Sequence, residues 1–155
     1  MIGIGYDVHQ FAERRPLVLG GVTVPHTHGL AGHSDADVLC HAIADAVLGA
    51  MGQPDIGHFF PPGDPSCAGI SSLDILKKCR ELVQLAGLRI VNVDATVIAE
   101  APRILPYREA MQRNIGEALG ILPGRVGIKA TTNETMGFVG RKEGIAAMAV
   151  AQVDE

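Results

Sequence analysis

The sequence predicts a single domain that mixes helices and strands. Its 155 residues suit one domain with a buried core. Apolar residues alternate along residues 89–99, as in a half-buried strand, and recur at helical spacing along residues 34–49 and 71–87. A nearly continuous apolar run at residues 144–153 adds a strand that must be covered on both faces.

The composition narrows the class of protein. Hydrophobic residues make up 47% and charged residues 19%, an ordinary globular balance. The net charge of −4 and the lack of a long basic run argue against a nucleic-acid partner. Three cysteines without C-x-x-C spacing fit a reducing compartment rather than a disulfide framework. With no apolar run of membrane-spanning length and no signal peptide, we expect a protein without membrane contact, in the cytoplasm.

The first third of the chain predicts two strands and a helix. Residues 1–8 form the first strand, and residues 17–24 form a second that bends at Gly20-Gly21. The polar segment 12–16 is expected to connect the two as a hairpin. Ser34 and Asp37 have the spacing of a capping box, so a helix is expected from residue 34 to about Gly49.

The rest of the chain continues the mixture. A loop rich in Gly and Pro spans residues 52–69, and a helix follows from Ser71 to Gly87 with Cys79 in the core. Strands are expected at residues 89–99, 125–130 and 144–153, with a helix over residues 106–120. Helices can cover one face of the last strand, and self-association would cover the other.

Asp7 and His9 form the first candidate site. Residues two apart on a strand point to the same face, so a carboxylate and an imidazole would lie side by side while Val8 turns away. These are two of the three protein ligands of a catalytic zinc site. The pair also fits a polar face of a solvated strand.

His41 supplies a third ligand to this pair. It lies on the first helix with Asp37 one turn before it and Asp45 one turn after it. Either aspartate could accept the second imidazole N–H, as carboxylates around metal ligands commonly do. Three protein ligands would leave the fourth zinc position open for catalysis. The alternative is an exposed polar edge of the helix.

Two further segments carry polar groups at strand ends. The turn Lys129 to Glu134 joins hydroxyls, backbone amides and a carboxylate, which suits a phosphate together with Mg²⁺. The segment Ala99 to Pro106 places Arg103 in a stiff turn between two prolines. A threonine-rich turn and a simple strand-to-helix connection are the alternatives for these two segments.

Five short motifs, in this order and spacing, resemble the 2-C-methyl-D-erythritol 2,4-cyclodiphosphate synthase family nearly from end to end. They are Gly5-Tyr6-Asp7-Val8-His9, His33-Ser34-Asp35-Ala36-Asp37-Val38, Asp55-Ile56-Gly57, Lys129-Ala130-Thr131-Thr132 with Glu134, and Gly137-Phe138-Val139-Gly140-Arg141. The resemblance implies an α+β fold with a mainly four-stranded sheet, helices on one face, and a homotrimer formed through the sheets.

The resemblance also implies the reaction. In this family, the 2-phosphate of 4-diphosphocytidyl-2-C-methyl-D-erythritol 2-phosphate attacks the β-phosphorus, CMP leaves, and 2-C-methyl-D-erythritol 2,4-cyclodiphosphate forms for isoprenoid synthesis. Active sites would lie between subunits. For a plant-type source, the compartment would be the plastid stroma, with the targeting segment absent here. The family also suggests an isoprenoid diphosphate in a cavity on the threefold axis.

Site residues follow from the same resemblance, position by position. Asp7, His9 and His41 match the zinc ligands, and Glu134 matches the ligand to Mg²⁺ or Mn²⁺. His33 and Thr132 match the residues that stabilise the transition state. Substrate contacts are implied for Ser34, Asp55, Ile56, Gly57, Phe60, Asp64, Ala99, Pro102, Arg103, Ile104, Leu105, Ala130, Thr131, Asn133, Phe138 and Arg141.

Cyclisation makes physical sense with these residues, because the substrate carries its own nucleophile and needs only positioning and charge neutralisation. Metals with Arg103, Lys129 and Arg141 would supply that charge. One departure is Arg103 itself, where family members often carry Lys. Two rival readings remain: a zinc-dependent nucleotide phosphohydrolase, in which the metal activates water, and a non-catalytic trimer that uses zinc structurally.

Overall fold

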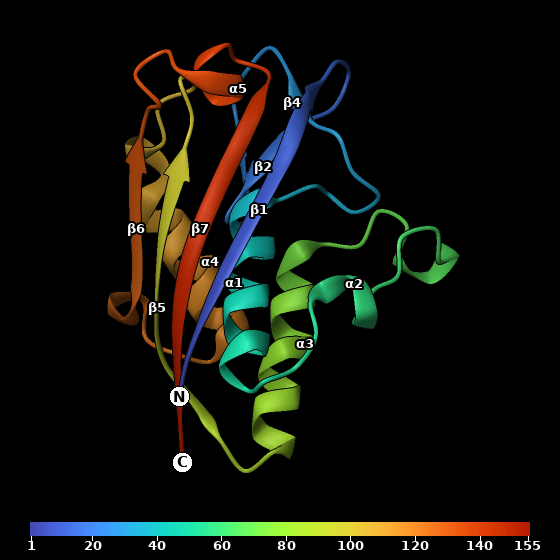
Figure 1. Ribbon diagram of the computed structural model, residues 1–155, viewed down its shortest axis with the longest axis vertical. Coiled ribbons are helices and arrows are strands. Elements are labelled where there is room, and N and C mark those ends of the chain that lie inside the picture. Colours follow the sequence, from blue (N-terminus) through green and yellow to red (C-terminus); the bar gives the residue numbers. More distant parts are fainter.

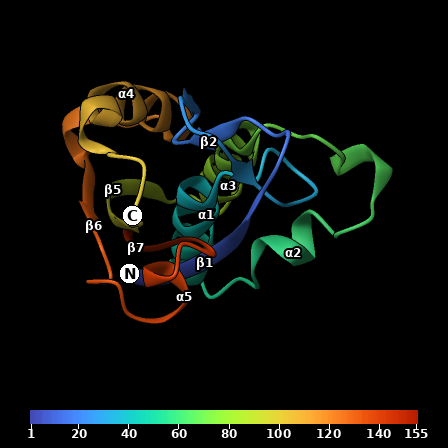
Figure 2. The same cartoon turned by 90° about the horizontal axis from the view of Figure 1, so that it is seen from above.

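The computed structural model describes all 155 residues and has one main sheet with helices on one side (Figures 1 and 2). The sheet has five strands in the order β4-β1-β7-β5-β6. Their bounds are β1 Ile2–Ala12, β4 Gly29–Leu30, β5 Arg89–Ile98, β6 Val126–Thr131 and β7 Gly144–Asp154. Because β4 has only two residues, the expected α+β fold with a mainly four-stranded sheet is confirmed.

Three long helices pack together behind this sheet (Figure 2). They are α1 Val38–Ala50, α3 Ser72–Leu85 and α4 Arg108–Leu119. Two short helices, α2 Ile56–Phe59 and α5 Gly137–Gly140, lie in the connections, with 3-10 turns at Pro65–Cys67, Leu105–Tyr107 and Pro123–Arg125. None of the helices combines the length and the apolar character needed to cross a membrane.

Strand pairing follows from the connections. β1 runs antiparallel to β7, with Ile2 opposite Gln152 and Gln10 opposite Gly144, and β7 runs antiparallel to β5. β5 and β6 are parallel, which requires a crossover, and α4 lies in that connection. As expected, Cys79 of α3 is buried, and Gly120 ends α4 with a left-handed φ of 70°.

The two glycines of β1 bring α1 directly against the sheet. A Cβ added at Gly5 would overlap the carbonyl oxygen of Ala42, and one at Gly3 would overlap that of Ala46. Only glycine therefore permits the helix backbone to lie this close to the strand. The close approach places the middle of α1 beside the start of β1, and it brings the first turn of α1, with His41, beside Asp7 and His9 in the middle of the strand.

The second strand differs from the expectation. Leu17–Leu19 and Val22–Val24 are separate strands, β2 and β3, and pair with each other across Gly20 and Gly21, both of which have positive φ. The prediction that segment 12–16 forms a hairpin between β1 and β2 is therefore wrong, since β1 pairs with β4 and β7 instead. A two-residue hairpin turn with positive φ at both positions favours glycine, so the chain reverses completely at Gly20-Gly21 instead of bending.

The start of α1 also differs. The helix begins at Val38, and Asp37 is its cap, accepting a hydrogen bond from the Cys40 amide at 3.0 Å. The Asp37 carboxylate also accepts the amides of Gly20 at 3.0 Å and Gly21 at 2.8 Å. Ser34 does not cap the helix, because its hydroxyl lies against the Ala36 amide and the ring of His41.

The loop predicted at residues 52–69 holds α2 and one 3-10 turn and projects from the body of the molecule beside α3 (Figure 1). The last strand has the two apolar faces that were expected. Ala147, Ala149 and Ala151 are buried towards the helices, whereas Met148 and Val150 are each 44% exposed on the opposite face. One face of the sheet is thus left apolar and open.

Candidate active site

Three metal-capable side chains converge between β1 and α1. The Oδ2 atom of Asp7 lies 2.9 Å from Nε2 of His9 and 3.1 Å from Nδ1 of His41. The two imidazole nitrogens are 3.1 Å apart. Asp7 and His9 point to the helix side of β1, and Val8 points to the open side, as the spacing predicted. The predicted convergence of Asp7, His9 and His41 is confirmed.

The surroundings of His9 define which nitrogen faces the cluster. Its Nδ1 lies 2.6 Å from the carbonyl oxygen of Ala31, which can only accept, so Nδ1 carries the proton. Neutral His9 therefore turns a lone pair on Nε2 towards the Asp7 carboxylate. Acceptors that face one another at 3 Å need a cation between them, and one oxygen with two nitrogens is a donor set that suits Zn²⁺ with an open fourth position.

In the absence of a metal, a proton can act as the cation between these facing acceptors. Burial raises the pKa of Asp7, but hydrogen bonds from His41 and His9 outweigh it and hold the pKa at about 2. Burial disfavours a charged His9, but the hydrogen bond and charge of Asp7 outweigh this effect and raise its pKa. The site thus stabilises positive charge next to a permanent carboxylate.

The expected carboxylate partner of His41 is a different residue. Neither Asp37 nor Asp45 accepts from the ring, because Asp37 caps α1 and Asp45 accepts the Ile56 amide at 2.8 Å. Nε2 of His41 lies instead 2.9 Å from the Ser72 hydroxyl, which in turn contacts Asp35. Burial raises the pKa of Asp45. Ser72 is 31 positions from His41, so no local spacing could reveal it.

A pocket of about 200 Å³ opens beside the triad. It brings together many of the residues that the family resemblance pointed to: His9, His33, Ser34, His41, Ile56, Gly57, Phe60 and Asp64. Asp55 does not line it but caps α2, accepting the His58 amide at 3.3 Å. Because Asp45 holds the Ile56 amide, the start of α2 is tied to α1. Helix α1 therefore supports both the wall of the pocket and the metal triad.

A second pocket, of about 540 Å³, lies where the parallel strands β5 and β6 end. Its lining includes eight residues that the family resemblance pointed to: Ala99, Pro102, Arg103, Ile104, Leu105, Ala130, Thr131 and Thr132. Strand pairing carries Thr131 to the end of β5 opposite Ile98, which joins the two segments. Arg103 is exposed and makes no ion pair, so its guanidinium is free to meet an anion.

The turn after β6 is held by one carboxylate. Oε1 of Glu100 accepts the amides of Asn133 at 3.2 Å and Thr135 at 3.0 Å. Glu134 between them has a φ of 50°, and its Oε1 lies 3.4 Å from the Thr132 hydroxyl. This turn leaves Glu134 exposed, and Glu134 does not belong to any group of three metal-capable side chains in its own chain.

Two other basic residues near this turn, Lys129 and Arg141, are already paired. Lys129 forms an ion pair with Asp94, and Arg141 lies 2.9 Å from Glu143. Lys129 stands in β6 beside Asp94 of β5, both exposed, and it lines neither pocket. The expectation that Lys129 neutralises a phosphate is therefore not supported by its position. Phe138 and Arg141 also line neither pocket.

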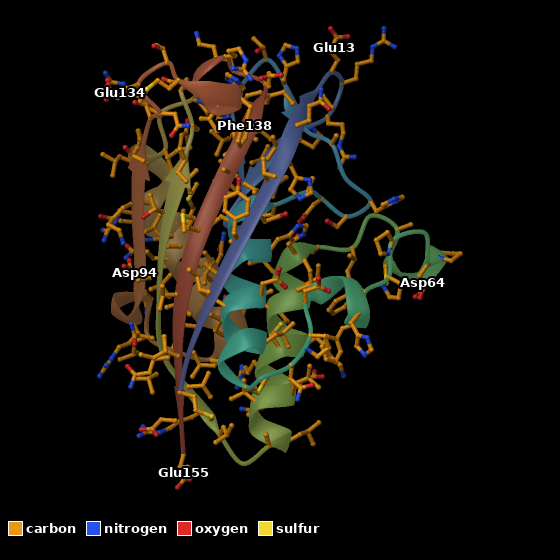
Figure 3. All side chains as sticks on the ribbon, in the orientation of Figure 1. Glu13, Asp64, Asp94, Glu134, Phe138 and Glu155 are labelled. Atoms are coloured by element: carbon orange, nitrogen blue, oxygen red, sulfur yellow. The ribbon has the colours of Figure 1, made fainter.

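The two pockets do not meet within one chain. Figure 3 shows Glu134 at the upper end of the sheet beside β6, whereas Asp64 lies on the loop that projects on the other side. One protomer therefore brings together the residues around the metal triad, and separately those around Arg103, but not the two groups.

An α+β domain with an open Asp-His-His triad beside a pocket defines a class of metal-binding enzymes. Within this class, the YgbB family model matches residues 1–154, and the chain belongs to the YgbB family. A relative from Akkermansia muciniphila, named 2-C-methyl-D-erythritol 2,4-cyclodiphosphate synthase, is 66% identical over 154 residues, 99% of this chain and 91% of the relative. The resemblance drawn from the five motifs is thereby confirmed.

Solved structures agree with this assignment. The bifunctional IspDF of Campylobacter jejuni superimposes with a TM-score of 0.94 and 42% identity, covering 99% of this chain and 42% of that one. This chain thus spans less than half of that bifunctional protein. A CDP complex of Plasmodium falciparum IspF has a TM-score of 0.85 and 35% identity, covering 99% and 94% of the two chains.

Proposed function

We propose that this chain converts 4-diphosphocytidyl-2-C-methyl-D-erythritol 2-phosphate to 2-C-methyl-D-erythritol 2,4-cyclodiphosphate and CMP, in isoprenoid precursor synthesis. The convergence of Asp7, His9 and His41 beside a pocket, in a chain of this family, is the observation that carries the proposal. The names of the curated relatives support the same reaction. The CDP-bound relative supports a cytidine nucleotide as part of the ligand.

The bonds exchanged are one P–O bond for another. An oxygen of the 2-phosphate attacks the β-phosphorus, and the bond from that phosphorus to the CMP oxygen breaks, so that CMP leaves. Because the nucleophile belongs to the substrate, the protein supplies proximity and charge complementarity. His33, in the triad pocket, and Thr132, in the second pocket, would donate hydrogen bonds to phosphate oxygens during this exchange.

Two metals would serve the phosphates. Asp7, His9 and His41 would hold Zn²⁺, because their donor atoms all lie within 4.8 Å of one another and combine one oxygen with two nitrogens. Glu134 would hold Mg²⁺ or Mn²⁺, which favours carboxylate and phosphate oxygens. A divalent cation supplies positive charge for the crowded phosphate oxygens. Arg103 is the free cation of the second pocket and would add to this charge.

The substrate would occupy two pockets from neighbouring protomers of a homotrimer. The cytidine end would lie against Ala99 and Pro102 to Leu105, and the diphosphate against the turn Ala130 to Asn133. The methylerythritol end would lie near Ser34, Asp55 to Gly57, Phe60 and Asp64. The separation of these groups within one chain supports this arrangement. The open apolar face of the sheet supports association through β1 and β7. Phe138 and Arg141 would then face a central cavity able to take an isoprenoid diphosphate.

Phosphorus NMR tests the reaction directly. The purified protein is incubated with the cytidine substrate, Zn²⁺ and Mg²⁺, and we expect equal amounts of CMP and a cyclic diphosphate. A His41→Ala variant should yield neither, because it lacks one zinc ligand. CMP together with a methylerythritol that carries two separate phosphates would instead indicate the rival phosphohydrolase, in which water rather than the 2-phosphate attacks the β-phosphorus. No turnover by a zinc-loaded trimer would favour a structural role for the metal.

A further inference from the structure

The two ring nitrogens of His41 have different surroundings. Nδ1 points into the metal triad, 3.1 Å from both Asp7 Oδ2 and His9 Nε2. Nε2 points away from it, 2.9 Å from the Ser72 hydroxyl and 3.2 Å from that of Ser34. Which nitrogen carries the proton decides whether His41 can offer a lone pair to a metal.

Asp35 determines the direction of the Ser72 hydroxyl. Its Oδ2 accepts the Ser72 amide at 2.9 Å, and its Oδ1 accepts the Asp37 amide at 3.2 Å and contacts the Ser72 hydroxyl closely. An ionised carboxylate can only accept, so the single hydroxyl proton of Ser72 points to Asp35. The hydroxyl oxygen then has only lone pairs for His41, and Nε2 must donate.

The same contacts tie three elements together. Asp35 precedes α1, His41 lies in α1, and Ser72 is the first residue of α3 and is fully buried. Backbone hydrogen bonds fasten the two approaching segments, from the Asp35 amide to the Ile70 carbonyl at 3.2 Å and from Gly69 to His33 at 2.8 Å. The direction of the imidazole is thus fixed by residues that do not reach the metal site.

We infer that Asp35 and Ser72 are positioning residues, which hold His41 in the tautomer and orientation that direct the Nδ1 lone pair to the metal. The inference rests on the proposed metal site. Neither residue contacts the triad oxygen or the His9 nitrogen, so both act through His41. Partners of this kind typically alter metal affinity by about 10- to 100-fold when they are removed.

Zinc affinity, measured by competition with a chromophoric chelator, tests the inference. Ser72→Ala should weaken Zn²⁺ binding by about 10- to 100-fold. The matched control is Ser71→Ala, since the neighbouring Ser71 forms no side-chain hydrogen bond at the helix start. Ser72→Thr keeps the hydroxyl and should restore most of the affinity. Co²⁺ absorption spectra of the same variants should show a weaker tetrahedral signature only where affinity falls.

Asp35→Asn provides a second variant of nearly the same shape. If the NH₂ group takes the place of Oδ2, it faces the Ser72 amide, which is also a donor. If it takes the place of Oδ1, it faces the Asp37 amide and donates to the Ser72 hydroxyl, whose proton must then turn towards His41. We expect a loss of zinc affinity at least as large as in Ser72→Ala, although the volume is unchanged. Unchanged affinity in folded Ser72→Ala or in Asp35→Asn, relative to Ser71→Ala, would overturn the inference. Because affinity is read without turnover, an unmodified protein that binds zinc but makes no cyclic product would contradict the proposed function alone.

Discussion

At the scale of single residues, the candidate site is a convergence of lone pairs. The carbonyl of Ala31 accepts a hydrogen bond from Nδ1–H of His9, and the hydroxyl oxygen of Ser72 accepts one from Nε2–H of His41. Each ring therefore presents an acceptor towards Asp7. This arrangement is unfavourable without a cation, which is why a proton or a metal must occupy it.

The pH dependence of the metal-free protein should reveal this preference for a cation. His9 has a pKa raised above its ordinary 6.5. Its stabilising contribution is therefore fully present below about pH 6.5 and is lost as the pH rises through the folded-state pKa. In the presence of a chelator, the melting temperature of the unmodified protein should exceed that of His9→Gln by more near pH 5.5 than near pH 9. A difference that grew with pH would contradict this.

Glu134 is the residue whose role depends most on other molecules, since nothing else in its chain completes a metal site around it. Glu134→Gln should slow turnover at least about tenfold and raise the Mg²⁺ concentration needed for half-maximal rate, because an amide is a weaker ligand than a carboxylate. Initial rates across a Mg²⁺ titration provide the measurement. Glu109→Gln, an exposed change on α4, is the control. Unaltered Mg²⁺ dependence in Glu134→Gln would remove it from this role.

The sequence predicted the ligands of the triad but not their support. Strand spacing predicted that Asp7 and His9 point to the same face, and the two aspartates one helical turn away from His41 marked it as the third candidate. Ser72 and Asp35 reach His41 only through the packing of α3 against the start of α1. The helical neighbours Asp37 and Asp45 had the right chemistry, but backbone amides of the β2–β3 turn and of α2 already occupy them.

At the scale of elements, the site depends on the contact between β1 and α1. Strand periodicity placed Asp7 and His9 on the helix side, and helical periodicity predicted the buried faces of α3 and α4. Periodicity could not show that β2 turns back on β3 rather than on β1, because both pairings satisfy the same pattern of apolar residues. The glycines of β1 look like turn residues in the sequence, yet they mark a close approach of two backbones.

Substitution of one of these glycines should disturb the triad from a distance. In Gly5→Ala, the new methyl group would overlap the Ala42 carbonyl, so α1 must move away from β1. We expect a loss of about 2–3 kcal/mol in the free energy of unfolding, measured by denaturant titration, and weaker zinc binding. The control is Gly49→Ala in α1, where the nearest atom to the added Cβ is 3.6 Å away.

The control substitution should be neutral or should stabilise the helix by up to about 1 kcal/mol, because alanine favours helix over glycine. Equal stability of Gly5→Ala and Gly49→Ala would show that the contact between β1 and α1 is not as tight as the structure indicates. Loss of stability without loss of zinc affinity would show that the triad does not depend on this contact.

At the scale of the whole molecule, the open face of the sheet is its most unusual surface. Ile2, Ile4 and Tyr6 of β1 are 75%, 67% and 51% exposed, and Ile4 and Tyr6 lie opposite Val150 and Met148 of β7. A contiguous apolar patch of this kind typically marks a protein interface. The sequence predicted the need for a partner from β7 alone, but the contribution of β1 emerged only from the strand register.

A charge in this patch should separate the protomers. Ile4→Asp would bury a carboxylate in the proposed interface without a partner, at a cost far above that of an exposed charge. Light scattering after gel filtration should give three times the 16.3 kDa chain mass for the unmodified protein and the single chain mass for Ile4→Asp. Leu85→Asp, at the exposed end of α3 where Leu85 is 82% accessible, should remain a trimer.

The same variant also separates zinc binding, which needs one chain, from turnover, which needs neighbouring protomers. Asp7, His9 and His41 belong to one chain, so monomeric Ile4→Asp should still bind zinc with an affinity within a few-fold of the unmodified protein. Turnover should fall below detection, because the pocket around Arg103 and the pocket beside the triad would no longer face each other across protomers. A monomer that kept its activity would contradict the shared site. A trimer in spite of the charge would move the interface away from β1.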